Sequence, residues 1–188
     1  MAEKKSLKPS EHNLTQRPDY VSAIGMVALE TVDLEIRLAG LFAAIVGLSS
    51  RVAQAIYFSP KAEQARMDIL RNAANAAYHV SPSRTGNQAK QKRDALLKVE
   101  TLLKRSEKVI RKRHRVVHDD WNISEKEKTV TRRPVGGELE RPRTPVPISD
   151  LSDIIKQLRE LIDDVYDLSK EFKERPPHMV SLRSEPRE

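Results

Sequence analysis

The feature that most constrains the fold is a run of aliphatic residues between Ser149 and Arg175. Its apolar positions recur at steps of three and four residues, which places them on one face of an α-helix. Ser149 or Ser152 supplies an N-cap, and the two prolines after Arg175 end the helix. A helix with this pattern must bury its apolar face against other elements. The apolar positions are Leu151, Ile154, Ile155, Leu158, Leu161, Ile162, Val165 and Leu168.

Three further segments, 19–45, 59–79 and 88–117, have the same helical periodicity, and 51–58 has room for a short additional helix. Aromatic residues make up only 4% of the chain, so its core must be mostly aliphatic, which favours packed helices over a β-sandwich. We therefore predict an all-α fold, an up-and-down four-helix bundle.

The inward faces of the middle two long helices follow from the same spacing. For 59–79 we expect Ala62, Ala65, Ile69, Ala73, Ala76 and Ala77 to face inward. For 88–117 we expect Leu96, Val99, Leu103, Ser106, Ile110 and Val117.

The bundle is expected to occupy 18–174 as one domain, with flexible tails at 1–17 and 175–188. Between the third and the last long helix, 120–147 has no helical period, and Pro142, Pro145 and Pro147 exclude a helix there. The brief alternation Thr129–Val130–Thr131 predicts a short, irregular hairpin there. Four arginines make this insertion basic: Arg132, Arg133, Arg141 and Arg143.

The net charge of +7 indicates a polyanionic partner, nucleic acid before a membrane surface or an acidic protein. No cysteine is present, which excludes disulfides and thiolate metal sites and is typical of a reducing cytoplasm. The longest uncharged run, Leu38 to Ser50, is short of the roughly 20 apolar residues that cross a bilayer, so we expect a cytoplasmic protein without a membrane span.

The candidate functional site is the stretch from Arg111 to Trp121, at the end of the third helical pattern. It follows a strongly basic segment, in which Glu107 is the single acid among Lys104, Arg105, Lys108, Arg111, Lys112, Arg113 and Arg115. On an ideal helix Arg111, His114, Arg115 and His118 share one face, whereas Arg113 points about 140° away from His118.

Three interpretations fit this stretch. The first is structural: the cations stabilise a helix C-terminus, and His118 pairs with Asp119 or Asp120. The second is a metal site on His114 and His118, although the zinc pattern His-Glu-x-x-His is absent because Arg115 follows His114. The third is metal-free RNA cleavage, in which a histidine moves protons and a guanidinium holds the phosphate.

The third interpretation gains weight from a resemblance. The segment Arg113-His114-Arg115-Val116-Val117-His118 resembles the Arg-Asn-x-x-x-His form of the Arg-x(4–6)-His motif of HEPN-domain proteins, which are often RNases. Arg111-x6-His118 fits the looser form too. Asp119-Asp120-Trp121 is similar to the Gly-x-Trp that follows this histidine in some members, with Asp119 in place of Gly. The resemblance extends to the helical layout over 19–173.

The resemblance implies a homodimer that brings two Arg–His pairs into one RNA-cleaving cleft without metal or another cofactor. By this analogy Arg113 holds the phosphate, His118 moves the proton and His114 is polar support in the Asn position. Lys108, Arg111, Lys112 and Arg115 would bind the RNA backbone. Many relatives act as toxins or in anti-phage defence, some beside an antitoxin partner.

One further residue, Glu35, lies on the apolar face of the first helix with Ile24, Thr31 and Leu38. A buried carboxylate needs a partner, so Glu35 either meets a cation from another helix, such as Arg113 or a nearby histidine, or reaches out at the edge of the apolar face. We thus predict a metal-independent endoribonuclease. The alternative is a non-catalytic bundle that binds nucleic acid or a protein partner.

Overall fold

The computed structural model describes residues 14–80, 85–124, 129–135 and 143–174. Within these ranges the chain forms a 3-10 helix, five α-helices and a small three-stranded sheet. In chain order the elements are η1 (Leu14–Gln16), α1 (Pro18–Val46), α2 (Ser50–Tyr57), α3 (Glu63–Tyr78), α4 (Asn87–His118), β1 (Asp120–Ser124), β2 (Thr129–Arg133), β3 (Thr144–Pro145) and α5 (Ile148–Glu174). The prediction of a mostly helical chain is confirmed.

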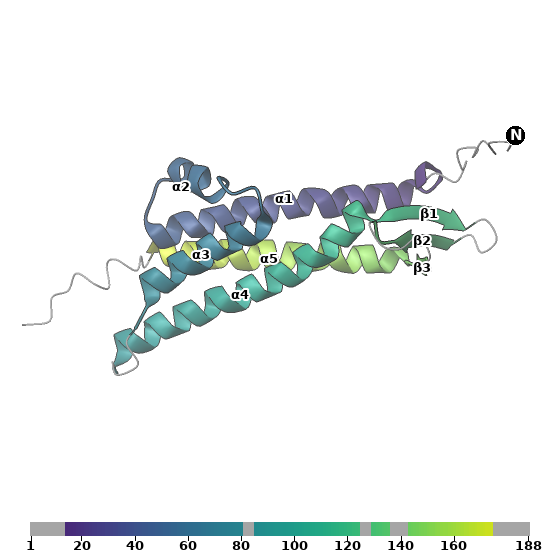
Figure 1. The fold of residues 1–188 in the computed structure, drawn as a ribbon. Coiled ribbons are helices and arrows are strands. Elements are labelled where there is room, and N and C mark those ends of the chain that lie inside the picture. The colour runs from purple at the N-terminus through teal and green to yellow at the C-terminus, as the bar shows by residue number, and fades with distance from the viewer. Residues whose placement is uncertain (1–13, 81–84, 125–128, 136–142, 175–188) are drawn as a thin grey trace, which may run out of the picture.

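Helices α1 and α5 lie side by side along the length of the structure and form its most extensive helix contact (Figure 1). They run in the same direction: Tyr20 near the start of α1 bonds to Val146 just before α5, and Arg37 lies over the ring of Tyr166 further along both helices. Helix α4 runs the opposite way beside α5, and α3 packs on α4.

The parallel pairing of α1 and α5 differs from strict up-and-down order, in which the first and last of four helices would be antiparallel. The difference arises after α1, which ends at Gly47 in the left-handed conformation (φ 69°). Short helix α2 then folds back over the end of α1, and the chain returns along α1 before α3 begins (Figure 1). Helix α3 consequently runs in the direction of α1 instead of reversing it.

The core is aliphatic, as the composition requires. All the predicted inward positions of α5 are buried except Ile155, which is half-buried, and in α4 Val99, Leu103, Ser106 and Ile110 are buried as expected. The inward face predicted for α3 is only partly correct: Ile69, Ala73 and Ala77 are partly buried against the core, whereas Ala62 and Ala76 are exposed. This helix begins at Glu63 rather than at Ser59, and its buried residues are Met67, Leu70, Ala74 and Tyr78. The alanines lie within about half of the helix circumference, and they indicated a face rotated away from the one that is buried.

The predicted hairpin in the insertion is present, formed by β1 and β2, with Trp121 paired to Arg132 and Ile123 to Val130. A third strand, β3, which the sequence did not predict, pairs with β2. Arg141 lies outside the described residues, as do 1–13 and 175–188 of the two expected tails. In the described ranges no helix combines the length and the apolar character that a membrane crossing requires.

Candidate functional site

The end of α4 is fixed by the sheet that follows it. Asp119 leaves the helix in an extended conformation, and an acid is disfavoured inside a helix C-terminus. The indole Nε1 of Trp121 donates a hydrogen bond of 2.8 Å to the carbonyl oxygen of Val116, which would otherwise lack a partner in the last helical turn. Helix α4 therefore ends at His118, close to the predicted end of the third helix.

Four cations form one exposed line along the second half of α4. Lys104, Lys108, Arg111 and Arg115 are spaced by four, three and four residues, so their side chains share the face of α4 that points away from the core. None of the four forms an ion pair with another residue in the described part of the chain. We call these four residues the cationic ridge.

Two histidines extend the cationic ridge at the C-terminus of α4. His114 and His118 are exposed, and their ring centroids are 4.5 Å apart with 51° between the ring planes. On the helix they lie beside Arg111, three and seven residues further along. The structure thus brings together on one open face the three residues Arg111, His114 and His118.

Arg113 takes a different position. It occupies the buried side of α4, between Ile110 and Val116, and its side chain is 20% exposed. Its Nη1 lies 3.2 Å from Oε1 of Glu63 at the start of α3, and its buried Nε has no hydrogen-bond partner. The arginine of the tighter motif is therefore held against α3, and within one chain it is not brought together with the exposed His118.

Glu35 does meet a cation from another helix, but the cation is Arg66 of α3 and not a residue near 113. The two side chains are mostly buried, and Nη2 of Arg66 donates a hydrogen bond of 3.0 Å to Oε1 of Glu35. Tyr57 lies fully buried near this pair; burial, and then the negative charge of Glu35, raise the pKa of its phenol well above the usual range. Glu35 thus belongs to the interior polar contacts between α1 and α3.

The acids that follow His118 are engaged by the sheet. The Nε of Arg132 lies 3.2 Å from Oδ2 of Asp119, and Arg133 and Arg143 both donate to Oδ2 of Asp120, at 3.1 and 3.0 Å. The pairing of His118 with Asp119 or Asp120 that the structural interpretation required is not among the contacts of the described chain. Two carboxylates thus hold three arginines of the basic insertion, so this cluster keeps a net charge of only about +1.

Other cations of α4 point toward α5 and have partners there. Lys112 donates a hydrogen bond of 2.9 Å to Gln157, although the sequence grouped it with the RNA-binding residues. Arg105 and Lys98 form ion pairs with Asp164 and Glu171, at 2.6 and 2.7 Å. The pattern of basic residues predicted a charged helix, but only the structure separates its paired cations from its unpaired ones.

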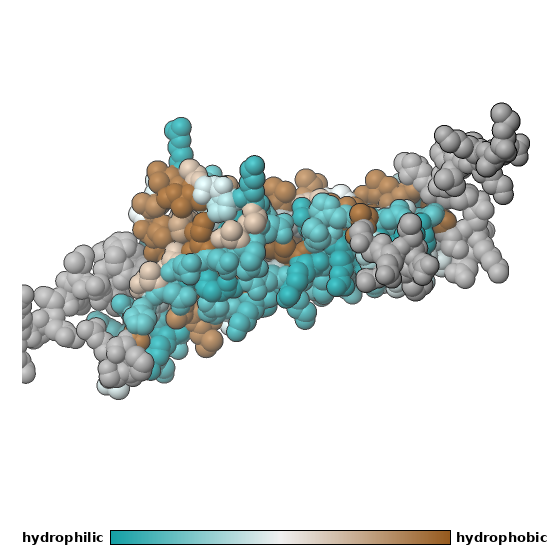
Figure 2. Space-filling model, viewed as in Figure 1, coloured by the Kyte–Doolittle hydropathy of each residue, from teal (hydrophilic) through white to brown (hydrophobic). Residues whose placement is uncertain are grey.

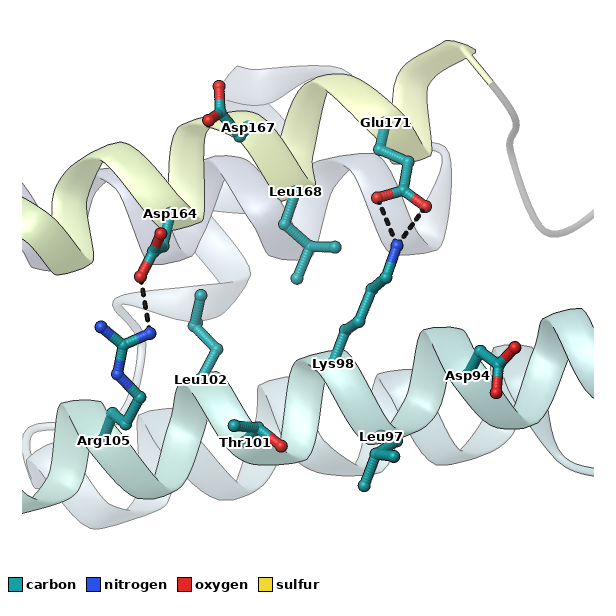
Figure 3. A pocket seen from close by; sticks show the side chains of 10 residues that line it. All are labelled: Asp94, Leu97, Lys98, Thr101, Leu102, Arg105, Asp164, Asp167, Leu168 and Glu171. Atoms are coloured by element: carbon teal, nitrogen blue, oxygen red, sulfur yellow. Dashed lines mark hydrogen bonds and ion pairs between the residues drawn. The ribbon is translucent and has the colours of Figure 1, made fainter.

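Those two ion pairs bridge an open groove of about 650 Å³ between α4 and α5, which the sequence did not predict (Figure 3). Leu102 and Leu168 point toward one another across it, and its rim carries Asp94, Asp164, Asp167 and Glu171. Carboxylates repel phosphates, so this groove is a poor site for nucleic acid.

The described residues offer few ligands for a metal ion. Across the described ranges no three histidine, cysteine or carboxylate residues are grouped as a metal ion would need, so His114 and His118 stand as a pair among cations.

Comparisons with protein-family models, with curated proteins and with solved structures gave no match.

Proposed function

We propose that this chain binds RNA along the cationic ridge and cleaves it without a metal ion, with Arg111, His114 and His118 as the reacting set. The observation that carries the proposal is the shared, exposed face of these three residues, together with the engagement of Arg113 by Glu63. Of the two arginines that fit the motif spacing, Arg111 is the one whose guanidinium is free to meet a phosphate.

The chemistry follows from these side chains. Cleavage of an RNA phosphodiester by its own 2′-hydroxyl needs a base for that proton, an acid for the departing 5′-oxygen and positive charge for the phosphorane. Two imidazoles can divide the proton transfers between them, because histidine exchanges protons near neutral pH. The guanidinium of Arg111 can bind two phosphate oxygens at once and stabilise the charge that develops there.

The cationic ridge binds the rest of the RNA strand. From Lys104 to His118 is about 21 Å of helix, enough to hold several phosphates of one strand. No Phe, Tyr or Trp side chain belongs to this line, so the contacts are mainly to the backbone and favour charge over base sequence. The long helices act together as a bundle that holds the ridge straight, and we propose that the protein works as a homodimer in the cytoplasm, with an antitoxin as a further candidate partner.

A second candidate is a bundle that binds nucleic acid without cleaving it. The ion pair of Arg113 with Glu63 favours this candidate, because it leaves the arginine of the tighter motif in a structural role. RNA binding along the cationic ridge fits both candidate functions equally, so only RNA cleavage distinguishes them.

The test is cleavage of a single-stranded RNA by the purified chain in the presence of EDTA. We expect the wild type to cut, and His118→Ala and His114→Ala to cut at least about 100-fold more slowly while binding RNA as before, since general acid–base catalysis contributes at least about that factor. His79→Ala, an exposed histidine just after α3, is the matched control and should cut at the wild-type rate. Binding without any cutting by the wild type would support the second candidate instead.

A further inference from the structure

The groove between α4 and α5 has an apolar floor that lies between two ion pairs. Leu102 and Leu168 form this floor, and they point toward one another across the groove (Figure 3). An ion pair joins the two helices on each side of the floor: Lys98 with Glu171, and Arg105 with Asp164. Seven residues separate the two pairs on each helix, which is about 10 Å. The floor is therefore as long as two turns of a further helix.

The rim of the groove carries two carboxylates without a partner. Asp94 of α4 and Asp167 of α5 are exposed, and neither forms a hydrogen bond or ion pair with another described residue. A second hollow, which shares Glu171 with the groove, adds Glu174 and Lys170 to the lining. The lining then holds five carboxylates and three cations, a net charge of −2 on a chain whose net charge is +7. The groove is an acidic region of a basic protein.

Leu97 adds an exposed apolar side chain to the same lining. It is 66% exposed, on a helix whose visible surface in Figure 2 is mostly hydrophilic. A single exposed leucine is ordinary, but this one lies beside an apolar floor and enlarges the apolar surface of the groove. An apolar floor with an acidic rim is the chemical complement of a basic amphipathic helix.

We propose that the groove between α4 and α5 binds a basic amphipathic helix of a protein partner. Apolar side chains spaced i, i+3, i+4 and i+7 on that helix would cover Leu102 and Leu168. Lysine or arginine side chains at its flanks would pair with Asp94 and Asp167. An acidic partner, or a nucleic acid, would meet unpaired carboxylates of its own sign in the groove.

The two ion pairs across the groove do not prevent this binding. Their four side chains are each between 46% and 52% exposed, and ion pairs so open to water are weak. Lys98 and Arg105 have long side chains that can turn aside when a helix enters. Asp164 and Glu171 would then be free to pair with the partner's cations, so the pairs exchange partners instead of being lost.

This inference goes beyond the proposed function and does not rest on it. The groove lies beside residues 94–105 of α4, whereas the cationic ridge occupies a neighbouring side of the same helix from Lys104 to Arg115. A basic helix in the groove and RNA on the ridge would therefore use different surfaces. Peptide binding can be measured without RNA, so the two proposals can fail separately.

The test uses a synthetic peptide of leucine and lysine, about four helical turns long, with the leucines on one face at the spacing given above. We expect the full chain to bind this peptide, as measured by fluorescence anisotropy of the labelled peptide. A peptide of the same composition in scrambled order has no apolar face, so it should bind at least about tenfold more weakly. Equal binding of the two peptides would overturn the proposal, because the groove would then recognise charge alone.

A charge variant tests the rim. Asp94→Asn/Asp167→Asn removes the two unpaired carboxylates and should weaken binding of the peptide by about fivefold. The matched control is Asp150→Asn/Asp153→Asn, which makes the same change in net charge at the other end of α5, where both acids are exposed. This control should bind the peptide as the wild type does. Equal weakening by both double variants would contradict the proposed site.

A second variant tests the apolar part of the groove without disturbing the core. Leu97→Gln should weaken peptide binding by about fivefold or more, whereas Leu29→Gln on α1, where the leucine is also 66% exposed, should leave it unchanged. No binding of the peptide by the wild type, or equal effects of these two variants, would contradict the proposal. Self-association of the wild type that Leu97→Gln abolishes would also overturn it, because a second copy would then occupy the groove.

Discussion

The salt dependence of RNA binding gives a number that the ridge must match. Each phosphate that a cation neutralises on a single strand releases counterions, and log K falls with log salt by about 0.7 for each such contact. The four unpaired cations of the ridge, each meeting one phosphate, therefore predict a slope of about −2.8. Between 50 and 200 mM salt, the affinity should fall by about 50-fold.

Removing two of these cations should halve the slope. The double variant Lys108→Gln/Arg111→Gln leaves two unpaired cations on the ridge, which predicts a slope of about −1.4 and a loss of only about sevenfold over the same salt range. The matched control is Lys98→Gln/Arg105→Gln on the same helix. It removes the same net charge, but both of these cations are already paired with acids of α5, so the slope should stay near −2.8.

The assay is fluorescence anisotropy of a labelled, 2′-O-methylated single strand at several salt concentrations, since that strand lacks the hydroxyl needed for cleavage. The reasoning would be refuted by a control variant that lowers the slope as much as the ridge variant does, because binding would then follow total charge and not the unpaired cations. A wild-type slope near zero would refute it as well.

Three predictions concern stability. Tyr57→Phe should raise the free energy of unfolding by about 1 kcal/mol, because the buried hydroxyl of Tyr57 has no hydrogen-bond partner in the described chain. Tyr20→Phe should lower the free energy of unfolding by about 1 kcal/mol, because it removes the 2.8 Å hydrogen bond to Val146. Chemical denaturation measures both changes. Burial raises the pKa of Tyr57 and Tyr78, so the folded state holds these protons more tightly than the unfolded state. The free energy of unfolding should therefore fall as the pH rises above about 10. The double Phe variant should lose less stability at alkaline pH, and an unchanged dependence of stability on pH would contradict the assignment. Leu158→Ala should cost about 2–5 kcal/mol in thermal or chemical unfolding, because Leu158 is fully buried, and a cost under 1 kcal/mol would contradict its place in the core.

Regular periodicity made part of the fold predictable. The apolar positions from Leu151 to Leu168 recur at steps of three and four residues, and nearly all of them are buried. They form a single apolar face, so only one side of this helix can pack against the core. In helix α3 the alanines indicated one side of the helix, but packing against α1 and α4 buried the neighbouring side, which carries Met67 and Leu70. Strand β3 has two residues and no periodicity, so it depends wholly on its pairing with β2.

The candidate site was predictable as a set of residues but not as a set of partners. Helical geometry alone indicated that Arg111, His114 and His118 share a face and that Arg113 points elsewhere. It gave no sign that Glu63 would hold Arg113, since that contact joins residues fifty positions apart. Which cation of a basic helix stays unpaired is decided by the neighbouring helices, and a single sequence does not contain that information in local form.

The most direct test of the account compares the two candidate arginines in the EDTA cleavage assay. Arg111→Gln removes the unpaired guanidinium beside the histidines, and we expect it to slow cleavage by about 100-fold or more. The double variant Glu63→Gln/Arg113→Gln removes the other guanidinium without stranding a carboxylate, and, once its fold is verified by circular dichroism, we expect it to cleave at close to the wild-type rate. Loss of cleavage in a folded double variant, with full activity in Arg111→Gln, would contradict the assignment of the site to the cationic ridge.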